Sequence, residues 1–230
     1  MSLEVLFEDE HLAAVAKPPG RIVVPGRGAP ERTIREEAEE ALGRLWVIHR
    51  LDRGTSGVLL LARNAGAHRE MCGRFERHEV VKRYLALVRG PFAAEQRIEV
   101  AIAPGRKGRM RAGEGLPGAR ASSTFVRPLL VFGSAASLVE AWPASGRTHQ
   151  VRVHLAHAGH PLLVDETYGD APPWASPDGQ VTLGRTPLHA ASLEFLHPVS
   201  GLPVRVEAPL PADMAAAERA LRADQASKRG

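Results

Sequence analysis

The sequence predicts an α+β fold, a single domain with a largely antiparallel mixed sheet flanked by helices and loops. Strand-like and helix-like segments are interspersed without the regular rhythm of βαβ units. Neighbouring strand-like segments follow one another as in hairpins, and 230 residues, 44% of them hydrophobic, are enough to bury a core. No linker is visible, so one functional domain is predicted over residues 1–210, followed by a C-terminal helix and frayed basic tail over 211–230.

The N-terminal residues are predicted to form a hairpin and then a turn. Leu3–Phe7 and Leu12–Ala16 are short apolar runs on either side of the polar residues Glu8–His11, which is the pattern of two strands and their connection. Lys17–Gly20 (KPPG) is predicted to turn, because two prolines and a glycine cannot continue a strand ladder.

Helix and strand signals follow. Thr33–Leu42 predicts a surface helix that begins at its threonine cap and stops at Gly43. Val58–Ala62 is a continuous apolar run, which is typical of a strand covered on both faces. Asn64 is a candidate cap for a helix that runs to about Glu76.

Alternating apolar residues in Val151–Leu155 fit a strand, but the same segment together with Ala158 fits a helical stripe. Gly159 followed by Pro161 is a helix-stop signal, and Thr148 can cap the start, so a helix is predicted here.

The remaining segments are assigned by the same patterns. Pro104–Gly118 is rich in Gly, Arg and Lys and predicts a flexible basic surface loop, and Ala171–Gly179 predicts a Pro-rich loop. Further strands are predicted at Val80–Val88, Ser122–Val131, Ser137–Trp142, Leu188–Leu196 and Pro203–Ala208. Met214–Leu221 predicts a helix, and Ala223–Gly230 is expected to fray.

Composition excludes several classes of protein. The formal net charge of +4 and the pI near 9.7 permit a polyanionic partner, whereas aromatic residues at 5% argue against repeated base-stacking platforms. The single cysteine, Cys72, excludes an intrachain disulfide framework and is predicted to be a buried structural thiol. Because no apolar run is long enough to span a bilayer and the first residues are acidic, a soluble, cytoplasmic protein is expected.

Two segments concentrate the polar groups that could perform chemistry. His49–Gly57 (HRLDRGTSG) places Asp52 in a glycine-bounded loop that leads into a buried strand, where a carboxylate can act. Without further information, the residues slightly favour the structural alternative, in which Asp52 caps a turn or pairs with Arg50 or Arg53. Gly146–Leu155 (GRTHQVRVHL) places Arg, Thr, His and Gln at a predicted helix start, which suits phosphate binding but also a solvated polar face.

These two segments resemble signatures of the RluA family of pseudouridine synthases. His49–Gly57 resembles its catalytic motif, Gly146–Leu155 its second signature, and Lys82–Ala86 (KRYLA) the segment that carries its active-site tyrosine. Further blocks match in order, from Lys17–Gly20 to Gly159-His160-Pro161, Asp165, Tyr168-Gly169, Leu188-His189-Ala190 and His197-Pro198. Val24–Arg27 resembles the member that gives the family its name, whose substrates are a tRNA anticodon stem-loop and a loop of large-subunit rRNA.

The resemblance implies isomerisation of uridine in RNA with Asp52 as the essential residue, acting as a nucleophile on the ribose or as a base in an elimination route. It places Arg152 against Asp52, where a guanidinium would keep the carboxylate ionised, and Tyr84 against the uracil. Arg50 is implied to fill the stack that a flipped base leaves.

The implied RNA contacts are otherwise phosphate contacts and neighbours of the two signatures. They are His49, Thr55, Arg147, Thr148, His149 and Gln150, with Arg106, Lys107, Arg109 and Arg111 of the basic loop as further candidates. Many members of the family carry an N-terminal S4-type RNA-binding domain, whereas this chain begins with the catalytic motifs, so no separate RNA anchor is expected.

The resemblance implies no cofactor and no metal, with rRNA or tRNA stem-loops as partners. A monomer is expected, although the sequence itself does not give the oligomeric state. A metal hydrolase drawn from His149, His154, His157 and His160 is the first rival, but no His-Glu-x-x-His occurs and the histidines do not share one helical face. The second rival is a non-catalytic RNA-binding protein on the same fold, against which Asp52, Tyr84 and Arg152 together argue.

Overall fold

The computed structural model describes residues 3–25, 31–169 and 172–228 of the chain. The chain forms two compact units. Unit 1 comprises residues 1–82 and 189–209, and unit 2 comprises residues 83–188 and 210–230. Each unit contains part of the mixed sheet and its own buried apolar residues.

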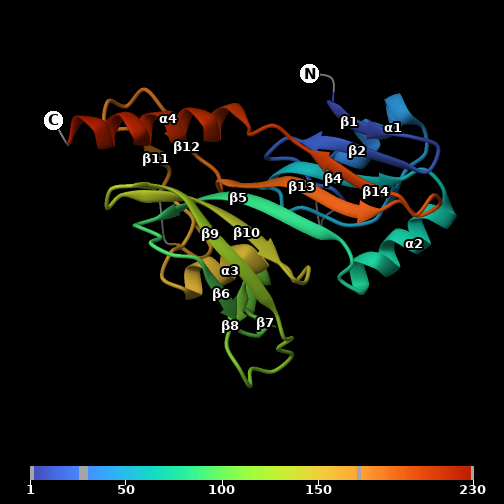
Figure 1. Ribbon diagram of the computed structural model, residues 1–230, viewed down its shortest axis with the longest axis horizontal. Helices are drawn as coiled ribbons and strands as arrows, with labels where there is room; N and C mark the ends of the chain where they lie inside the picture. The colour runs from blue at the N-terminus through green and yellow to red at the C-terminus, as the bar shows by residue number, and fades with distance from the viewer. Residues whose placement is uncertain (1–2, 26–30, 170–171, 229–230) are drawn as a thin grey trace. The chain divides into compact units, whose positions relative to one another are not determined.

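Unit 1 is a sheet in the order β1-β2-β4-β13, with β14 beside β13 (Figure 1). The short strand β3 pairs with β4. Its strands are β1 Val5–Glu8, β2 Leu12–Lys17, β3 Trp46–Val47, β4 Ser56–Ala62, β13 Leu188–Leu196 and β14 Pro203–Glu207. The pairs are antiparallel except β4 with β13, which run parallel where Ser56 lies opposite His189 and Gly57 opposite Ala190.

Two helices cover opposite faces of this sheet, because side chains alternate between the faces of a strand. Helix α1 (Ile34–Leu42) packs on the face that contains Leu59 and Leu61. Helix α2 (Ala65–Glu76) packs on the face that contains Val58 and Leu60. All seven residues of β4 are therefore buried, which explains its unbroken apolar sequence.

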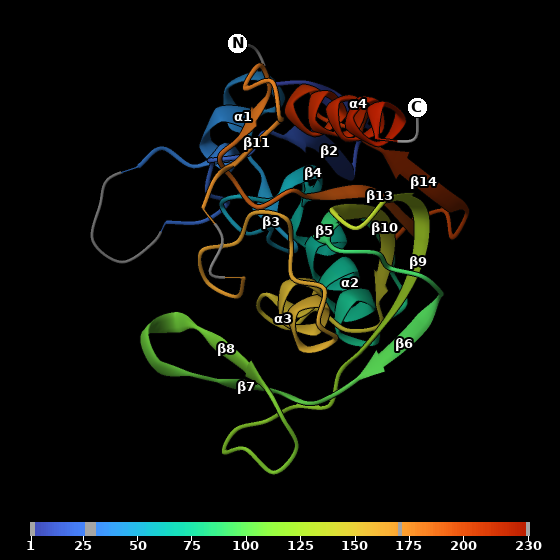
Figure 2. The same cartoon turned by 90° about the vertical axis from the view of Figure 1, so that its left-hand side faces the viewer.

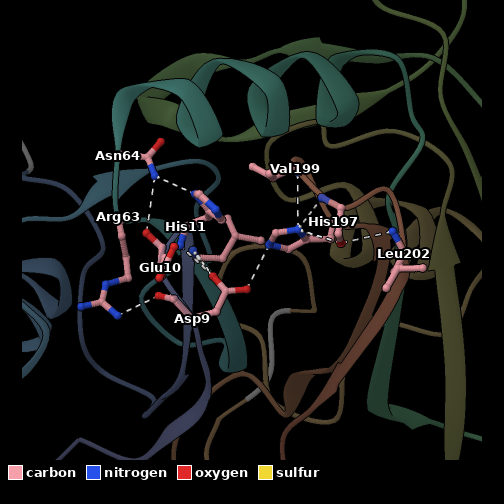
Figure 3. A network of polar contacts seen from close by, with 10 residues as sticks. Asp9, Glu10, His11, Arg63, Asn64, His197, Val199 and Leu202 are labelled. Carbon is pink, nitrogen blue, oxygen red and sulfur yellow. Dashed lines mark hydrogen bonds and ion pairs between the residues drawn. The ribbon is translucent and has the colours of Figure 1, made fainter.

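A polar network ties the β1–β2 turn to the turn after β13 (Figure 3). The Asp9 carboxylate accepts hydrogen bonds from the backbone N–H groups of His11 and Leu12 at 2.7 and 2.8 Å, and its other oxygen lies 3.0 Å from Nε2 of His197. Arg63 donates to the backbone oxygen of Asp9 at 2.7 Å. These contacts hold together the β1–β2 turn, the residue after β4 and the turn after β13.

Unit 2 is an antiparallel sheet in the order β5-β10-β9-β6. Its strands are β5 Val81–Arg89, β6 Gln96–Glu99, β9 Ser123–Phe132 and β10 Ala136–Pro143. Two small strand pairs accompany it, β7 Ile102–Pro104 with β8 Met110–Ala112 and β11 Trp174–Ala175 with β12 Thr182–Leu183, and the short 3₁₀ helix η1 spans Arg106–Gly108.

Two helices belong to unit 2. Helix α3 (Gln150–His157) packs Val151 and Leu155 against apolar residues of β5, β9 and β10. Helix α4 (Ala212–Ser227) buries Met214, Ala217 and Leu221 in a second apolar cluster. Strand β8 lies beside α3, as both views show (Figures 1 and 2), so the β7–β8 hairpin lies against that helix.

Most predicted elements are confirmed. The hairpin β1–β2 forms, Thr33 and Glu36 make a reciprocal capping box on α1, and Asn64 caps α2 by accepting the N–H of Ala67 at 2.9 Å. The segment with two possible patterns is the helix α3, as predicted. The α+β class with a mainly antiparallel, mixed sheet is also confirmed.

Several local predictions are wrong or incomplete. The predicted Pro-rich loop Ala171–Gly179 contains the short strand β11 (Trp174–Ala175), which pairs with β12. The region from Pro104 to Gly118 is not all loop, because Met110–Ala112 pairs with β7 and η1 fills the connection. The predicted fraying from Ala223 is wrong, since α4 continues to Ser227. Cys72 is partly exposed rather than buried. Residues 46–47 and 96–99, too short for a period-two signal, form strands that the sequence did not indicate.

Candidate active site

Asp52 lies in a tight turn just before the buried strand β4. The backbone N–H of Thr55 donates to the backbone oxygen of Asp52 at 3.0 Å, which closes the turn. The Leu51 side chain is buried on one side of Asp52, whereas Asp52 itself is half-buried. The carboxylate therefore sits on a fixed backbone and keeps part of its surface accessible, as a reacting group requires.

Lys17 holds the loop that carries Asp52. Its side chain is only 1% exposed, and its ammonium group donates to the backbone oxygens of Pro18 at 2.9 Å, Arg21 at 2.7 Å and Arg53 at 3.2 Å. The backbone N–H of Gly20 donates to the same Arg53 oxygen at 2.8 Å. The KPPG turn thus binds the residue that follows Asp52, and three carbonyl acceptors match the three donors of a buried ammonium.

Gly57 permits the close approach of β4 and β13. Its φ is +118°, and a Cβ built there would lie 2.1 Å from the backbone oxygen of Ala190. Beside it, the Ser56 hydroxyl lies 3.0 Å from Nδ1 of His189, whose Nε2 lies 3.2 Å from the backbone oxygen of Ala208. Only glycine fits this position, so the TSG part of the motif joins the Asp52 loop to β13.

His49 supports β4. Its Nε2 accepts the backbone N–H of Leu60 at 3.0 Å, and its ring stacks on Phe75 with 4.7 Å between centroids. Burial, with a smaller contribution from the charge of Lys82, lowers the pKa of His49 to about 3. The ring is therefore neutral near pH 7 and acts as an acceptor inside unit 1.

The other side chains of this motif differ in exposure. Arg50 is exposed. Arg53 forms an ion pair with Glu31, so its guanidinium has a charged partner other than Asp52. The Thr55 hydroxyl is buried and makes no hydrogen bond to any residue that the structure describes. An RNA contact by Arg50 has an exposed side chain to carry it, whereas the Thr55 side chain is buried and the His49 ring contacts Leu60 and Phe75 within unit 1.

In unit 2, Tyr84 lies on β5 opposite Ala141 of β10. It is half-buried and packs against the apolar cluster that includes Val151 and Leu155 of α3. Its neighbour Arg83 pairs with the buried Glu140 at 2.6 Å, which ties β5 to β10 next to the ring. A half-buried ring on a rigid strand is suited to stacking on a base.

Arg152 is held by a buried carboxylate that the sequence analysis did not assign to it. Nε and Nη2 of Arg152 donate to the two oxygens of Asp165, both at 2.8 Å. Arg152 is 7% exposed and Asp165 is 1% exposed. This bidentate pair fixes the plane of the guanidinium and the direction in which its Nη1 edge projects.

Tyr168 contacts the same arginine. The Arg152 guanidinium lies 5.0 Å from the centroid of the Tyr168 ring, and the Tyr168 hydroxyl lies 2.7 Å from Nδ1 of His149. His149 is the N-cap residue of α3 and has a left-handed backbone, with φ at 56°. The prediction that Thr148 caps this helix is therefore wrong, and His149 makes its side-chain contact with Tyr168 instead.

Gln150 holds the loop before α3. Its side-chain oxygen accepts from the Ser145 hydroxyl at 2.6 Å and from the backbone N–H of Arg147 at 3.1 Å. Its side-chain nitrogen donates to the backbone oxygen of Ser123 at 2.9 Å. Gln150 is 4% exposed, so its amide shapes the loop that presents the half-buried Arg147 and the exposed Thr148.

A groove of about 590 Å³ runs between α3 and the β7–β8 hairpin. Its charged lining is Arg106, Arg109, Arg111 and His157, all exposed, and we call it the basic groove. Val153 and Tyr168 contribute to its floor. Three arginines beside an apolar floor form a surface that favours a polyanion, as phosphate binding requires. The side chain of Lys107 lies outside what the structure describes, as do Gly26 and Arg27 of the Val24–Arg27 segment.

Comparison with known proteins decides what this arrangement is. A family model described as RNA pseudouridylate synthase matches residues 11–157. The chain is 37% identical to ribosomal large subunit pseudouridine synthase D of Xylella fastidiosa, a match that covers 97% of this chain and 71% of the relative. This chain belongs to the RNA pseudouridylate synthase family. It is an enzyme, a pseudouridine synthase, and the non-catalytic alternative is not supported.

Other relatives and solved structures agree. Ribosomal large subunit pseudouridine synthase C of Escherichia coli (strain K12) is 38% identical, over 90% of this chain and 66% of that protein. Human RNA pseudouridylate synthase domain containing 1 superposes with a TM-score of 0.71 at 27% identity, covering 96% of this chain and 95% of that one. Human RNA pseudouridylate synthase domain containing 4 has the same fold, with a TM-score of 0.77 at 24% identity over 95% and 93% of the two chains.

The RluA-type family predicted from the motifs is therefore confirmed. The finer prediction, that the chain is most similar to the member after which the family is named, is not, because the bacterial relatives are named synthases D and C. The pairing of Arg152 with Asp52 that the resemblance implies stays a prediction.

Sequence reasoning missed three supporting residues of the synthase. Lys17, Asp165 and Tyr168 each stood in a matched block, but a single sequence does not reveal which backbone oxygens or guanidinium they bind. For Lys17 the sequence did contain a signal, a lysine followed by two prolines. A charged side chain in a turn beside a buried strand needs hydrogen-bond acceptors such as backbone oxygens.

Metal ligation is not indicated by the geometry. Across residues 3–25, 31–169 and 172–228, no group of three or more His, Cys, Asp or Glu side chains is arranged to hold a metal ion. His154 is fully buried, with Nδ1 at 2.7 Å from the Thr124 hydroxyl, and burial lowers its pKa.

None of the helices that the structure describes is long and apolar enough to cross a membrane.

Proposed function

We propose that this synthase converts uridine to pseudouridine in large-subunit ribosomal RNA, with Asp52 as the reacting carboxylate. The observation that carries the proposal is the placement of Asp52 in a turn that Lys17 and the buried strand β4 hold in position, in a chain whose bacterial relatives bear the name ribosomal large subunit pseudouridine synthase.

The reaction is an isomerisation. The bond between C1′ and N1 of the uridine breaks, the uracil turns, and a bond forms between C1′ and C5; the C5 proton is lost and a proton is gained at N1. Breaking the glycosidic bond develops positive charge on the ribose, which a carboxylate stabilises or traps as an ester. A carboxylate that removes a ribose proton gives an elimination route instead, and both roles require an ionised Asp52.

Hydrolysis would divert the same intermediate, so the site must lack a second free carboxylate that activates water. Inverting glycoside hydrolases use two carboxyl groups, one of them as that base. In unit 2 the buried acids are engaged otherwise, because Asp165 is bound to Arg152 and Glu140 is bound to Arg83 and Arg127. This supports rearrangement without water.

Arg152 and Tyr84 are proposed to complete the chemistry. A guanidinium held by Asp165 in a fixed plane stabilises negative charge at a defined point, either on a carboxylate or on the departing uracil. Tyr84 offers an aromatic face for the uracil and a hydroxyl that can relay a proton, passing its own proton toward N1 as it receives the one that C5 loses. Both side chains project from regular elements of unit 2, Arg152 from α3 and Tyr84 from β5.

RNA binding is proposed to use separate groups. A stacked uridine cannot reach a carboxylate in a turn, so the base must leave its stack, and the exposed Arg50 can fill the space with its planar guanidinium. Phosphates are proposed to bind Arg147, Thr148 and the basic groove.

The test of the substrate is a pseudouridine map of total RNA from cells with and without the gene. Loss of one or a few sites in large-subunit rRNA, restored by the wild-type gene, is the expected result. Loss confined to tRNA would overturn the rRNA assignment and favour stem-loops of tRNA size. Activity as a monomer and without a metal ion is also proposed, and undiminished turnover in a chelator together with a monomeric mass in solution would support both.

A further inference from the structure

Tyr168 lies where three segments of unit 2 meet. Its hydroxyl accepts the backbone N–H of Met110 on β8 at 2.9 Å and lies 2.7 Å from Nδ1 of His149 at the start of α3. Its ring has the Arg152 guanidinium 5.0 Å from the centroid and that of Arg109 at 5.6 Å. Tyr168 follows the part of the chain that the family model matches, which ends at residue 157.

The hydroxyl joins the hairpin to the helix. A phenol has one proton and two lone pairs, so it can accept from Met110 and donate to Nδ1 of His149 at the same time. In that arrangement the proton of a neutral His149 lies on Nε2. The contact therefore sets both the position of β8 and the orientation of the His149 ring. The backbone of His149 is left-handed.

The ring acts on Arg152 in a second way. Asp165 fixes the guanidinium edge-on through two hydrogen bonds, while the Tyr168 ring lies within cation–π distance of it. The backbone N–H of Tyr168 also donates to Asp165, at 3.1 Å. Tyr168 thus contacts Arg152 directly and also contacts the carboxylate that orients Arg152.

We propose that Tyr168 is a positioning residue with two separable parts. Its ring orients Arg152 for the chemical step, and its hydroxyl anchors the β7–β8 hairpin, whose arginines line the basic groove, for RNA binding. The first part rests on the proposed role of Arg152 in the reaction. Ring loss then lowers kcat, whereas hydroxyl loss raises KM.

The test compares the kcat and KM of two substitutions, measured under multiple-turnover conditions with an rRNA fragment that contains the target uridine in unmodified form. Tyr168→Phe keeps the ring and is expected to raise KM by about threefold to tenfold with kcat within about twofold, as the loss of hydrogen bonds predicts. Tyr168→Leu removes ring and hydroxyl and is expected to lower kcat by about tenfold or more in addition. Phe125→Leu, which removes a ring that contacts Trp142 in the same unit, controls for loss of packing.

A double-mutant cycle shows whether the effect passes through Arg152. In an Arg152→Lys background, Tyr168→Leu is expected to lower kcat by less than about twofold further, because the guanidinium that it orients is gone. Full additivity, or equal losses of kcat in Tyr168→Leu and Phe125→Leu, would overturn the proposal. Absence of pseudouridine with the wild-type enzyme would instead overturn the proposed function, so the two failures are distinguishable.

Discussion

Replacement of Gly57 by alanine should detach the Asp52 loop from its support. The added Cβ would lie 2.1 Å from the oxygen, 2.6 Å from the carbon and 2.7 Å from the nitrogen of Ala190. All three atoms are backbone atoms of β13, so no side chain can turn aside. The parallel pairing of Ser56 with His189 and of Gly57 with Ala190 must open instead.

The size of the effect follows from two contributions. An alanine at a φ of +118° carries a backbone strain of roughly 1–2 kcal/mol. Forcing an extra carbon into a closed contact adds about 1–3 kcal/mol. Gly57→Ala is therefore expected to lower the free energy of unfolding by ~2–5 kcal/mol, a large part of the ~5–15 kcal/mol that stabilises an ordinary domain.

Gly201 supplies the matched control in the same unit. Its φ is +70°, but nothing lies within 4 Å of the Cβ that an alanine would add. Gly201→Ala therefore carries the backbone strain alone, roughly 1–2 kcal/mol. Urea unfolding followed by circular dichroism compares the two variants with the wild type. Equal losses of stability in both, or full turnover by Gly57→Ala at a temperature where it is folded, would refute the close-contact argument.

Three further predictions concern side chains of the site. Below about pH 6.5 the unfolded chain binds a proton at an ordinary imidazole, whereas folded His49, with a pKa of about 3, does not. This group should therefore lower the free energy of unfolding of the wild type by ~1.4 kcal/mol for each unit by which the pH is lowered from about 6.5 toward 3. His49→Gln should show a shallower dependence in urea unfolding at several pH values, and an identical slope would contradict the assignment. Asp165→Asn should lower the free energy of unfolding by about 3–5 kcal/mol and slow turnover, because it removes the carboxylate that pairs with the buried Arg152. Asp213→Asn, at the more exposed pair with Arg185, should lower it by about 1 kcal/mol or less. Equal shifts of the melting temperature would show that the buried pair stabilises the fold no more than the exposed one. Arg50→Ala should slow turnover on a folded rRNA hairpin far more than on a flexible single strand, measured by tritium release from C5 of uridine, and equal losses would remove its role in base flipping.

Much of the fold could be predicted because it depends on local signals. The Thr33 cap, the Asn64 cap and the apolar run of β4 are each visible within a few residues, and each forms as predicted. The short strands β3 and β8 could not be predicted, because two or three residues show no periodicity and their pairing depends on distant partners.

The site shows the same division. Asp52, Tyr84 and Arg152 were selected through motifs, but their supports are long-range contacts that one sequence does not encode visibly. Lys17 binds the backbone oxygen of Arg53, 36 residues away, and Asp165 binds Arg152 from 13 residues away. The structural contacts of His49, whose ring accepts a backbone N–H of β4 and stacks on Phe75, were likewise not visible in the sequence, and its contact with RNA stays a prediction.

This synthase is proposed to isomerise uridine in large-subunit rRNA with Asp52 as the reacting carboxylate. The most direct test of this proposal is incubation of the purified protein, wild type and Asp52→Asn, with large-subunit rRNA that lacks the modification, followed by pseudouridine mapping and by measurement of RNA affinity. An asparagine has the shape of the carboxylate but is neither a nucleophile nor a base, so the account predicts pseudouridine at defined positions with the wild type, none with Asp52→Asn, and nearly equal affinity of both for the RNA. Turnover by Asp52→Asn near the wild-type rate would contradict it.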